Sequence, residues 1–441
     1  MRCACSLLAA SPALLLPGLA PAPRAARAPP SCASAARAWW PQVQGPFDLP
    51  AADRATLRRE IVPGEVWSLE QVQGVIYVHV PVRMMVTKIR GGLFAYSVVA
   101  PTNECLRLLS ELEAEHGPLT HILLPTLALE HKSFAAPFAR ARPDAQLWVA
   151  PGQYSFPLDL PAPLLGFPFG TKVLPAEWSD DAAPWAAELR WWTLGPLREK
   201  VGGYAEMAVY HLASSTLLLT DLLASVPSVC PEIVALNDVR APLFHARSVA
   251  ADRVSDAPAT RDRGWSRIAL FALYFKPGAL KVINDPADGD ALAFWSTAFP
   301  KEVPACMRDL GWAGFWPFEW DVPQASAAFT ALARGGELVV PPILQVTILN
   351  RDPSVVLDFA ERVAAECEPF RRGEPCTVVT AHFDAPATAD RDAWLAAFTF
   401  LRGEGSSLPE RDLAFLRELD RQLVEGGTVR SPAVFGPPEY S

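Results

Sequence analysis

The chain has 441 residues, of which 50% are hydrophobic and 20% charged, so it can bury a large core and is not disordered over most of its length. Its net charge of −9 argues against a general nucleic-acid-binding protein, because such a protein needs a cationic surface to neutralise phosphates. Its 44 prolines disfavour long coiled coils and helical repeats.

Residues 1–47 differ from the rest of the chain, because they contain four arginines and no acidic residue. We interpret them as a removable targeting leader. The uncharged stretch Cys3–Pro23 is typical of a secretory signal, and Arg24–Arg37 is typical of a transit peptide. A signal followed by a transit peptide, as in algae with complex plastids, accounts for both. We therefore predict the plastid stroma as the location, with the secretory pathway, or a disordered tail without a targeting role, as the alternatives.

No later segment has the roughly 20 apolar residues that a membrane-spanning helix needs. The longest candidate, Ile268–Phe275, has eight, so we predict no transmembrane segment. The five cysteines outside the leader are widely spaced and include no Cys-x-x-Cys pair, which disfavours a disulfide scaffold or a structural zinc site. Cys367 and Cys376 could form a redox pair, and two idle buried thiols are the favoured interpretation.

The folded part begins with short runs rich in β-branched and aromatic residues, which predict antiparallel strands. These runs are Gly74–Val82, Met84–Ile89 and Leu93–Val99. Next comes a predicted helix at Asn103–His116 with leucines on one face, followed by the stop signal Gly117-Pro118. A strand, helix, strand succession then predicts an α/β unit, in which ligands bind at the carboxyl ends of strands. Its members are His121–Pro125, His131–Arg140 and Gln146–Ala150.

After a proline-rich connection, β character resumes at Glu188–Leu194, and a predicted β-hairpin follows, formed by Glu206–Leu212 and Thr216–Asp221. Residues 227–336 are irregular and helical, and we interpret them as an insertion. Five aromatic residues fall within Trp312–Trp320; they indicate an insertion core, or else an aromatic wall over the site or a docking patch. The remaining predicted elements are helices at Gln324–Arg334, Ser354–Glu366, Arg391–Leu401 and Leu408–Leu423 and a strand at Cys376–His382.

Three potential metal ligands follow or end predicted strands in different parts of the chain: His131, Asp221 and His382. Side chains at the carboxyl ends of strands can converge at one edge of a sheet sandwich, which is how metal sites are often assembled. Each also has a simpler structural interpretation, since His131 could serve in a polar core and Asp221 could cap a turn or helix.

The segment Leu124–His131 resembles the His-x-His-x-Asp-His signature of the metallo-β-lactamase-like hydrolases in position and in its surrounding strand and helix. In this resemblance the signature's first two histidines correspond to Thr126 and Ala128, its aspartate to Glu130 and its last histidine to His131. The segment Val201–Leu223 resembles the next part of the family pattern. There the family histidine is replaced by Gly202 or Gly203, and the bridging aspartate corresponds to Asp221. The final family histidine corresponds to His382, within Val378–Asp384.

This resemblance implies that one of the family's two metal sites is lost and that the other is retained. The ligands of the retained site correspond to Glu130, His131, Asp221 and His382. It therefore implies one divalent transition metal, either zinc, iron or manganese, because these cations accept a mixed nitrogen and oxygen ligand set. The extra methylene of Glu130 moves its carboxylate by roughly 1.5 Å, so Glu130 could instead form a surface ion pair beside Lys132. Asp384 is a weaker candidate, as the acceptor that orients His382, and His245 is another, as a replacement ligand or proton shuttle.

From about Leu57 to Leu401 the chain resembles an uncharacterised family of cyanobacteria and plastid-bearing eukaryotes, catalogued as domain of unknown function forty-three thirty-six. The stretches that carry this resemblance include Thr56–Ile89, Val99–Pro118, Leu129–Leu158 and Pro242–Arg247. It implies an α/β protein with the metallo-β-lactamase-like fold, a four-layer αββα sandwich. We therefore predict a leader at 1–47, a domain at 48–402 with the insertion at about 227–336, and a C-terminal helix and tail at 403–441.

Two functions follow as hypotheses. The first is a mononuclear metal-dependent hydrolase that acts on a small ester, thioester or phosphoester. The second is a metal-free binding or assembly protein, whose partner would be a plastid protein. Neither a phosphate-binding glycine loop nor a dinucleotide fingerprint is present, so we expect no nucleotide. We likewise expect no flavin, which makes redox chemistry at a non-haem iron a weaker third option.

Overall fold

The computed structural model describes residues 43–44, 54–75, 78–153, 164, 166–199, 202–249, 252–282, 318–403 and 406–433. Apart from Val43–Gln44, the predicted leader lies outside these described residues, and so do residues 312–317 of the aromatic cluster. The helices in the described ranges include none that is long and apolar enough to cross a lipid bilayer.

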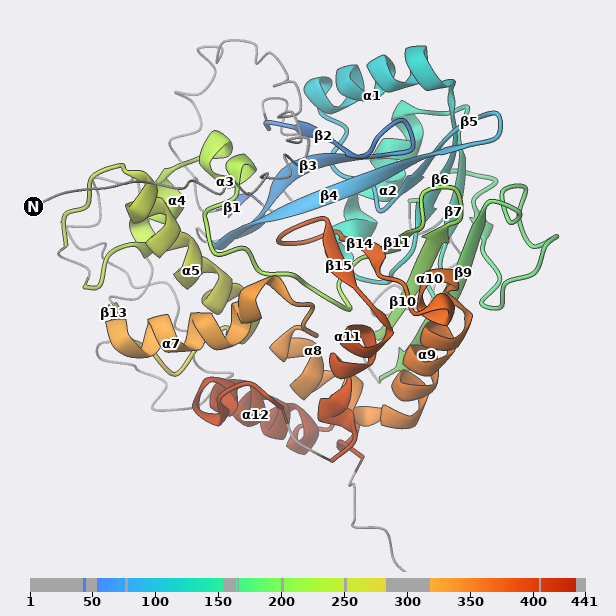
Figure 1. The fold of residues 1–441 in the computed structure, drawn as a ribbon. Coiled ribbons are helices and arrows are strands. Elements are labelled where there is room, and N and C mark those ends of the chain that lie inside the picture. The colour runs from blue at the N-terminus through green and yellow to red at the C-terminus, as the bar shows by residue number, and fades with distance from the viewer. Residues whose placement is uncertain are drawn as a thin grey trace, which may run out of the picture.

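Eight strands of the described chain form the first sheet (Figure 1). They are β1 (Val43–Gln44), β2 (Leu57–Val62), β3 (Val66–Val75), β4 (Val78–Ile89), β5 (Gly92–Tyr96), β6 (Leu119–Leu124), β7 (Gln146–Val149) and β8 (Lys172–Val173). Strands β2 to β5 pair antiparallel, whereas β5 to β8 pair parallel. Helices α1 (Asn103–His116) and α2 (Leu129–Ala141) make the crossovers that the first two parallel pairs require.

Strand β4 is longer than the sequence pattern indicates, because it joins most of the two predicted runs on either side of Arg83. Pro81 and Arg83 interrupt the apolar pattern of this strand. Both lie in the part of β4 that extends beyond β5, which pairs only with Met85–Ile89. A proline is tolerated at such a sheet margin, so the strand continues through it.

The second sheet has five strands in the described part of the chain, in the order β15-β14-β11-β10-β9. They are β9 (Leu189–Arg198), β10 (Gly203–His211), β11 (Thr216–Leu219), β14 (Cys376–Thr380) and β15 (Ala387–Ala389). The predicted hairpin is present as β10 and β11. Because β11 and β14 are parallel, the residues that follow these two strands leave the sheet at the same edge.

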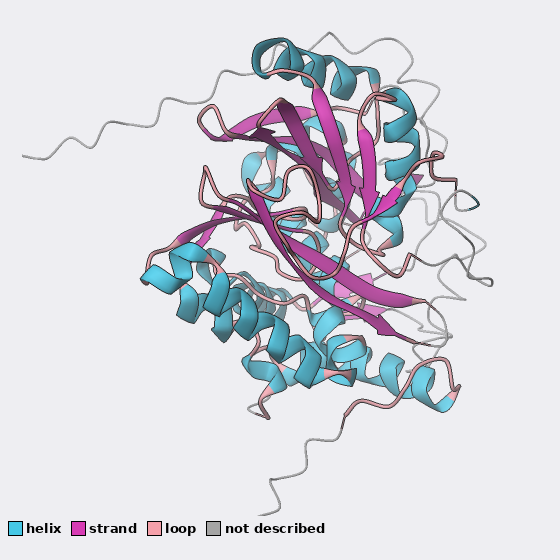
Figure 2. Cartoon of the chain, turned by 90° about the vertical axis from the view of Figure 1, so that its right-hand side faces the viewer, coloured by secondary structure: helices cyan, strands magenta, loops and turns pink. Residues whose placement is uncertain are grey.

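Neighbouring residues of the central strands face opposite layers. Met84 packs with α1 and α2, whereas Met85 packs against the second sheet. In the second sheet, Leu217 packs with α9 (Pro353–Glu366) and α11 (Arg391–Ala396), whereas Leu218 faces the first sheet. The two sheets are therefore stacked face to face with helices outside each of them (Figure 2). This arrangement is the predicted four-layer αββα sandwich, and the predicted fold class is confirmed.

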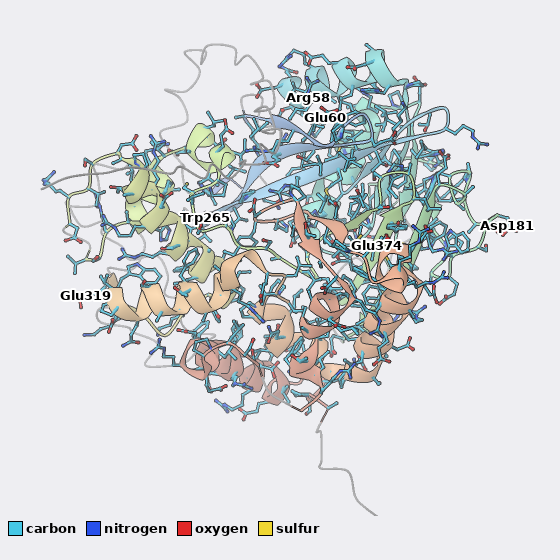
Figure 3. All side chains as sticks on the ribbon, in the orientation of Figure 1. Arg58, Glu60, Asp181, Trp265, Glu319 and Glu374 are labelled. Carbon is cyan, nitrogen blue, oxygen red and sulfur yellow. The ribbon has the colours of Figure 1, made fainter. Side chains whose placement is uncertain are left out.

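A separate group of helices packs around its own apolar cluster beside the sandwich (Figure 1). Its members are α3 (Glu232–Asn237), α4 (Arg240–His245), α5 (Pro258–Tyr274), α7 (Val322–Ala333) and α12 (Glu410–Glu425). Trp265 of α5 (Figure 3) is fully buried there, and its indole N–H donates to the Pro227 carbonyl at 2.8 Å. The described part of the segment 227–336 supplies four of these helices, and its status as an insertion stays a prediction.

Short elements complete the described chain. They are α8 (Pro342–Thr347), α10 (Glu368–Arg372), β12 (Leu280–Val282), β13 (Phe318–Trp320) and the 3-10 turns Arg334–Gly336, Leu349–Arg351 and Thr399–Leu401. Helix α8 joins two regions of the core, because Leu344 packs in the cluster of α9 and Val346 packs in the cluster of α5.

Candidate metal centre

The structure brings the four predicted ligands together at one edge of the sandwich. Glu130 and His131 lie in the first turn of α2, just after β6. Asp221 lies two residues after β11, and His382 lies two residues after β14. Each of the four offers one donor atom, and these atoms all lie within 4.8 Å of one another. Among the described residues, this is the one group of three or more His, Cys, Asp or Glu side chains with such spacing.

Three of the donor atoms form a nearly equilateral triangle. The Nε2 atoms of His131 and His382 are 3.2 Å apart, and they lie 3.2 and 3.1 Å from Oδ1 of Asp221. Atoms with these separations can share a common point at about 2.0–2.2 Å, the bond length of zinc to nitrogen and oxygen ligands. The triangle therefore has the dimensions of a metal ligand set.

Hydrogen bonds at the far side of each imidazole determine which nitrogen carries the proton. Nδ1 of His382 lies 2.9 Å from the Pro81 carbonyl, which can only accept, so the proton of the neutral ring is on Nδ1. Nδ1 of His131 lies 2.8 Å from Oγ of Ser97, a hydroxyl that can accept from the same tautomer. Both Nε2 lone pairs then point at a carboxylate oxygen. A positive charge, either a bound cation or a proton on His131, would stabilise such a group.

Ser97, His131 and Asp221 include the residue types of a nucleophilic triad, but they do not form one. Ser97 is fully buried and is absent from the residues that line the adjacent cavity. It directly follows β5, with a backbone φ of 57°, and its Oγ lies 2.8 Å from Nδ1 of His131. Ser97 is therefore placed to orient the imidazole rather than to attack a substrate.

The carboxylate of Asp221 lies next to both imidazoles. Burial by itself raises the pKa of Asp221, but the neighbouring His131 and His382 outweigh burial and hold it well below its usual range. Conversely, burial lowers the pKa of His131, and Asp221 more than offsets this, so the pKa of His131 is raised. Oδ2 of Asp221 is buried and has no hydrogen-bond partner among the described residues. This free oxygen and the mixed donor set fit a divalent transition metal.

Glu206, on β10, holds the loop that carries Asp221, and the sequence analysis did not single it out. Its side chain is fully buried and accepts from three successive backbone N–H groups, those of Thr220 at 2.7 Å, Asp221 at 3.0 Å and Leu222 at 2.8 Å. The Tyr204 hydroxyl donates to it at 2.9 Å. Burial, followed by the nearby Asp221 carboxylate, raises the pKa of Glu206. The sequence offered one signal of this role, which was an acidic residue in an otherwise largely apolar predicted strand.

Arg83 has the corresponding role for His382. From β4 of the first sheet, its guanidinium donates to the carbonyls of Thr380, His382 and Phe383. Its Nε also donates to Glu70 at 3.2 Å, and both side chains of this ion pair are almost fully buried. The guanidinium of Arg83 thus joins the two sheets at the site. In the sequence, the one sign of this role was that Arg83 interrupts an apolar strand pattern.

The positions that the sequence resemblance assigned to a second metal site carry no comparable ligands. Thr126 is buried, and its Oγ1 accepts from the Ala128 N–H at 3.1 Å. Ala128 and Gly203 line the cavity and have no side-chain donor atom.

The two weaker candidates lie in other environments. Asp384 is exposed, and its Oδ1 accepts from the Ala385 N–H at 3.0 Å. The acceptor for the Nδ1–H of His382 is the Pro81 carbonyl instead. His245 is fully buried in α4, with its ring edge-on to Phe244 and Phe271 at 5.2 and 6.0 Å. It is not among the described residues that line the cavity.

A cavity of about 590 Å³ opens beside the four ligands. Glu130, Asp221 and His382 lie in its wall, together with apolar side chains from α5, α8 and α12. This volume lies within the roughly 300–1,000 Å³ typical of small-molecule sites.

Solved structures with some similarity to the chain are metallo-beta-lactamases. One from Pontibacter korlensis is 12% identical, covers 43% of this chain and 82% of its own, and has a TM-score of 0.30. The DIM-1 metallo-beta-lactamase is 9% identical, covers 64% of this chain and 97% of its own, and has a TM-score of 0.29. No curated protein sequence matches the chain.

The chain also matches a protein-family model that is described as "Domain of unknown function (DUF4336)". The match extends over residues 63–400, which is more than half of the 441 residues. It includes all four candidate ligands and every strand of the two sheets except β1 and β2. The chain therefore belongs to the DUF4336 family.

Proposed function

We propose that the chain is a mononuclear metal-dependent hydrolase that cleaves an ester, thioester or phosphoester bond. The observation that carries the proposal is the triangle of two imidazole nitrogens and one carboxylate oxygen at 3.1–3.2 Å, in the wall of a cavity of small-molecule size. Zinc, iron and manganese accept this donor set. When bound, such an ion supplies hydroxide near neutral pH, because it lowers the pKa of its water.

The chain's own residues support the proposal by fixing the ligands before any ion arrives. Ser97 and the Pro81 carbonyl fix the two imidazole rings, and Glu206 fixes the loop of Asp221. Such partners raise metal affinity because the site pays little reorganisation on binding. Glu130 offers a further carboxylate at the cavity wall.

Metal analysis of the purified mature chain tests the proposal. We expect close to one equivalent of zinc, iron or manganese by mass spectrometry, and loss of that metal in His131→Ala. The matched control is His116→Ala on α1, which removes an imidazole outside the cluster and should leave the metal content unchanged. Absence of metal from the wild-type chain, even after dialysis against zinc, would refute the proposal.

A metal-free binding protein is the second candidate. It is favoured by Thr126, Ala128 and Gly202 or Gly203, because they replace the three histidines of one of the two metal sites in the pattern that the chain resembles. In that case a protonated His131 would provide the positive charge beside Asp221, as its raised pKa allows. A partner protein that stays bound after His131, Asp221 and His382 are all replaced by alanine would support this function. A chain that loads metal and hydrolyses esters would exclude it.

A further inference from the structure

The cavity beside the four ligands has a polar end and an apolar end. The polar end contains Asp221 and His382, and the apolar walls include Leu223 after β11, Ala272 of α5 and Leu344 of α8. Leu423 of α12 also lies in the wall. A ligand that fills the cavity therefore meets hydrocarbon over most of its surface, and meets Asp221 and His382 at the polar end.

The charged residues in the wall exclude one class of ligand. Among the described lining residues, the carboxylate and imidazole side chains are Glu130, Glu199, Asp221 and His382, and neither lysine nor arginine is present. Glu199 is already paired with Arg430 at 3.1 Å. A divalent ion held by the carboxylates of Glu130 and Asp221 has its two charges balanced by them. A phosphate or carboxylate group inside the cavity would then still lack a cationic side chain to balance it, which is unfavourable in a partly desolvated site.

We infer that the substrate is a neutral carboxylic ester or thioester with an extended apolar acyl chain. This inference rests on the proposed hydrolase function and narrows its substrate class. The acyl carbonyl lies at the polar end beside Asp221 and His382, and the chain extends between α5, α8 and α12. In the net reaction water adds its oxygen to the acyl carbon, the C–O or C–S bond breaks, and the leaving alcohol or thiol takes a proton, with no change of oxidation state.

Ala272 sets the length of chain that the cavity accepts. It is half-buried on α5, and its small side chain leaves space that a larger one would fill. Each methylene buried in the cavity strengthens binding by up to about fourfold, so a longer apolar chain binds more tightly until the cavity is full.

The first experiment measures binding without catalysis. Neutral methyl ketones of 6, 10 and 14 carbons, which are not hydrolysed, displace the neutral fluorophore N-phenyl-1-naphthylamine from the full chain. We expect affinity to rise at least tenfold from 6 to 10 carbons, in wild type and in the metal-site variant His131→Ala. Equal affinity for all three ketones, or tighter binding of decyl phosphate than of the 10-carbon ketone, would overturn the inference.

Substitutions of residues in the cavity wall test whether the ketones bind in the cavity. Ala272→Phe should weaken binding of the 10-carbon ketone at least tenfold, and Leu423→Gln, in the part of the wall that α12 supplies, should weaken it severalfold. The matched control is Ala327→Phe on the exposed face of α7, which should change nothing. Circular dichroism and melting temperature show whether each variant is folded. Folded cavity variants with unchanged ketone affinity would place the ketones elsewhere and overturn the inference.

The second experiment separates the substrate class from the proposed function. The zinc-loaded chain is assayed with p-nitrophenyl esters of 2, 8 and 12 acyl carbons. We expect kcat/KM to be highest for the 8- or 12-carbon ester and to fall at least tenfold for that ester in Ala272→Phe. Hydrolysis without chain-length preference would overturn the substrate class and leave the hydrolase standing. Length-dependent ketone binding without any hydrolysis would refute the hydrolase and support an apolar binding cavity.

Discussion

At the scale of single residues, the geometry of the cluster depends on side chains that cannot themselves bind the ion. Glu206 is the clearest case, since its carboxylate accepts from three consecutive N–H groups and thereby fixes the backbone on both sides of Asp221. Backbone groups at the end of a strand otherwise lack partners, and buried unpaired N–H groups are costly.

Replacement of Glu206 by glutamine should therefore destabilise the protein. One carboxylate oxygen becomes an NH2 group that faces N–H donors, and we expect a loss of about 1.5–3 kcal/mol in the free energy of unfolding. Urea denaturation measures this loss, and zinc titration should show weaker binding. The matched control is Glu374→Gln at an exposed position (Figure 3), which should stay within about 0.5 kcal/mol of wild type. Equal stability of the two variants would contradict the role of Glu206.

His79 on β4 predicts a pH dependence of stability. Burial lowers the pKa of His79 from 6.5 to about 4, so the folded chain keeps it neutral where the unfolded chain protonates it. The unfolded state then binds more protons between pH 6.5 and 4, and stability falls as pH falls through this window, by about 3 kcal/mol at most. In His79→Gln the free energy of unfolding should vary less between pH 7 and pH 4. Parallel pH curves for wild type and variant would show that His79 is not responsible.

At the scale of elements, helices α4 and α5 approach each other unusually closely at Gly264. A Cβ atom there would lie 1.8 Å from the Pro242 carbonyl oxygen, so no side chain fits unless the two helices separate. The glycine is thus required by packing, although glycine lowers the stability of an isolated helix.

Gly264→Ala should therefore lower stability, by about 1–3 kcal/mol or more, because overpacking outweighs the gain in helix propensity. Thermal unfolding measures the effect. Ser266→Ala on the same helix is the control and should change stability by no more than about 0.5 kcal/mol. A stabilised Gly264→Ala would show that the helices separate readily.

The sequence predicts helices and strands well where the residues that determine them are neighbours along the chain. Leucine spacing and the Gly117-Pro118 stop place α1 at Asn103–His116, as observed. The interruption of the apolar pattern at Arg83 gave a wrong predicted strand boundary. The pattern is interrupted because the partners of Arg83 are carbonyls about 300 positions away along the chain. The predicted strand ends indicated that His131, Asp221 and His382 lie near one another. In contrast, the roles of Ser97, Glu206 and Arg83 depend on contacts that only the folded chain forms.

At the scale of the whole molecule, the candidate ligands come from both sheets, with His131 from the first and Asp221 and His382 from the second. A bound ion therefore connects the two halves of the sandwich. Zinc should raise the free energy of unfolding by about 2.7 kcal/mol at a free concentration 100 times its dissociation constant. EDTA should reverse the gain, and His131→Ala should not show it. An identical gain in that variant would place the zinc elsewhere.

The cellular location is a property of the whole molecule, and we propose that residues 1–47 direct the protein to the plastid stroma. A fluorescent protein fused behind residues 1–47 should accumulate in plastids in a host with complex plastids, because the segment combines an apolar stretch with an arginine-bearing region. The same fusion lacking residues 1–23 should stay outside. Secretion of the full fusion would favour the alternative pathway.

The division of the cavity between two sets of elements has an evolutionary consequence. Strand-end loops and the start of α2 present the polar groups, whereas helices outside the two sheets supply much of the hydrocarbon wall. With the proposed substrate class, mutations at Ala272 or Leu423 should therefore change the preferred acyl-chain length without disturbing the candidate ligands. Paralogues that retain His131, Asp221 and His382 but diverge at these helices should form a series of enzymes with shared chemistry and different chain-length selectivity.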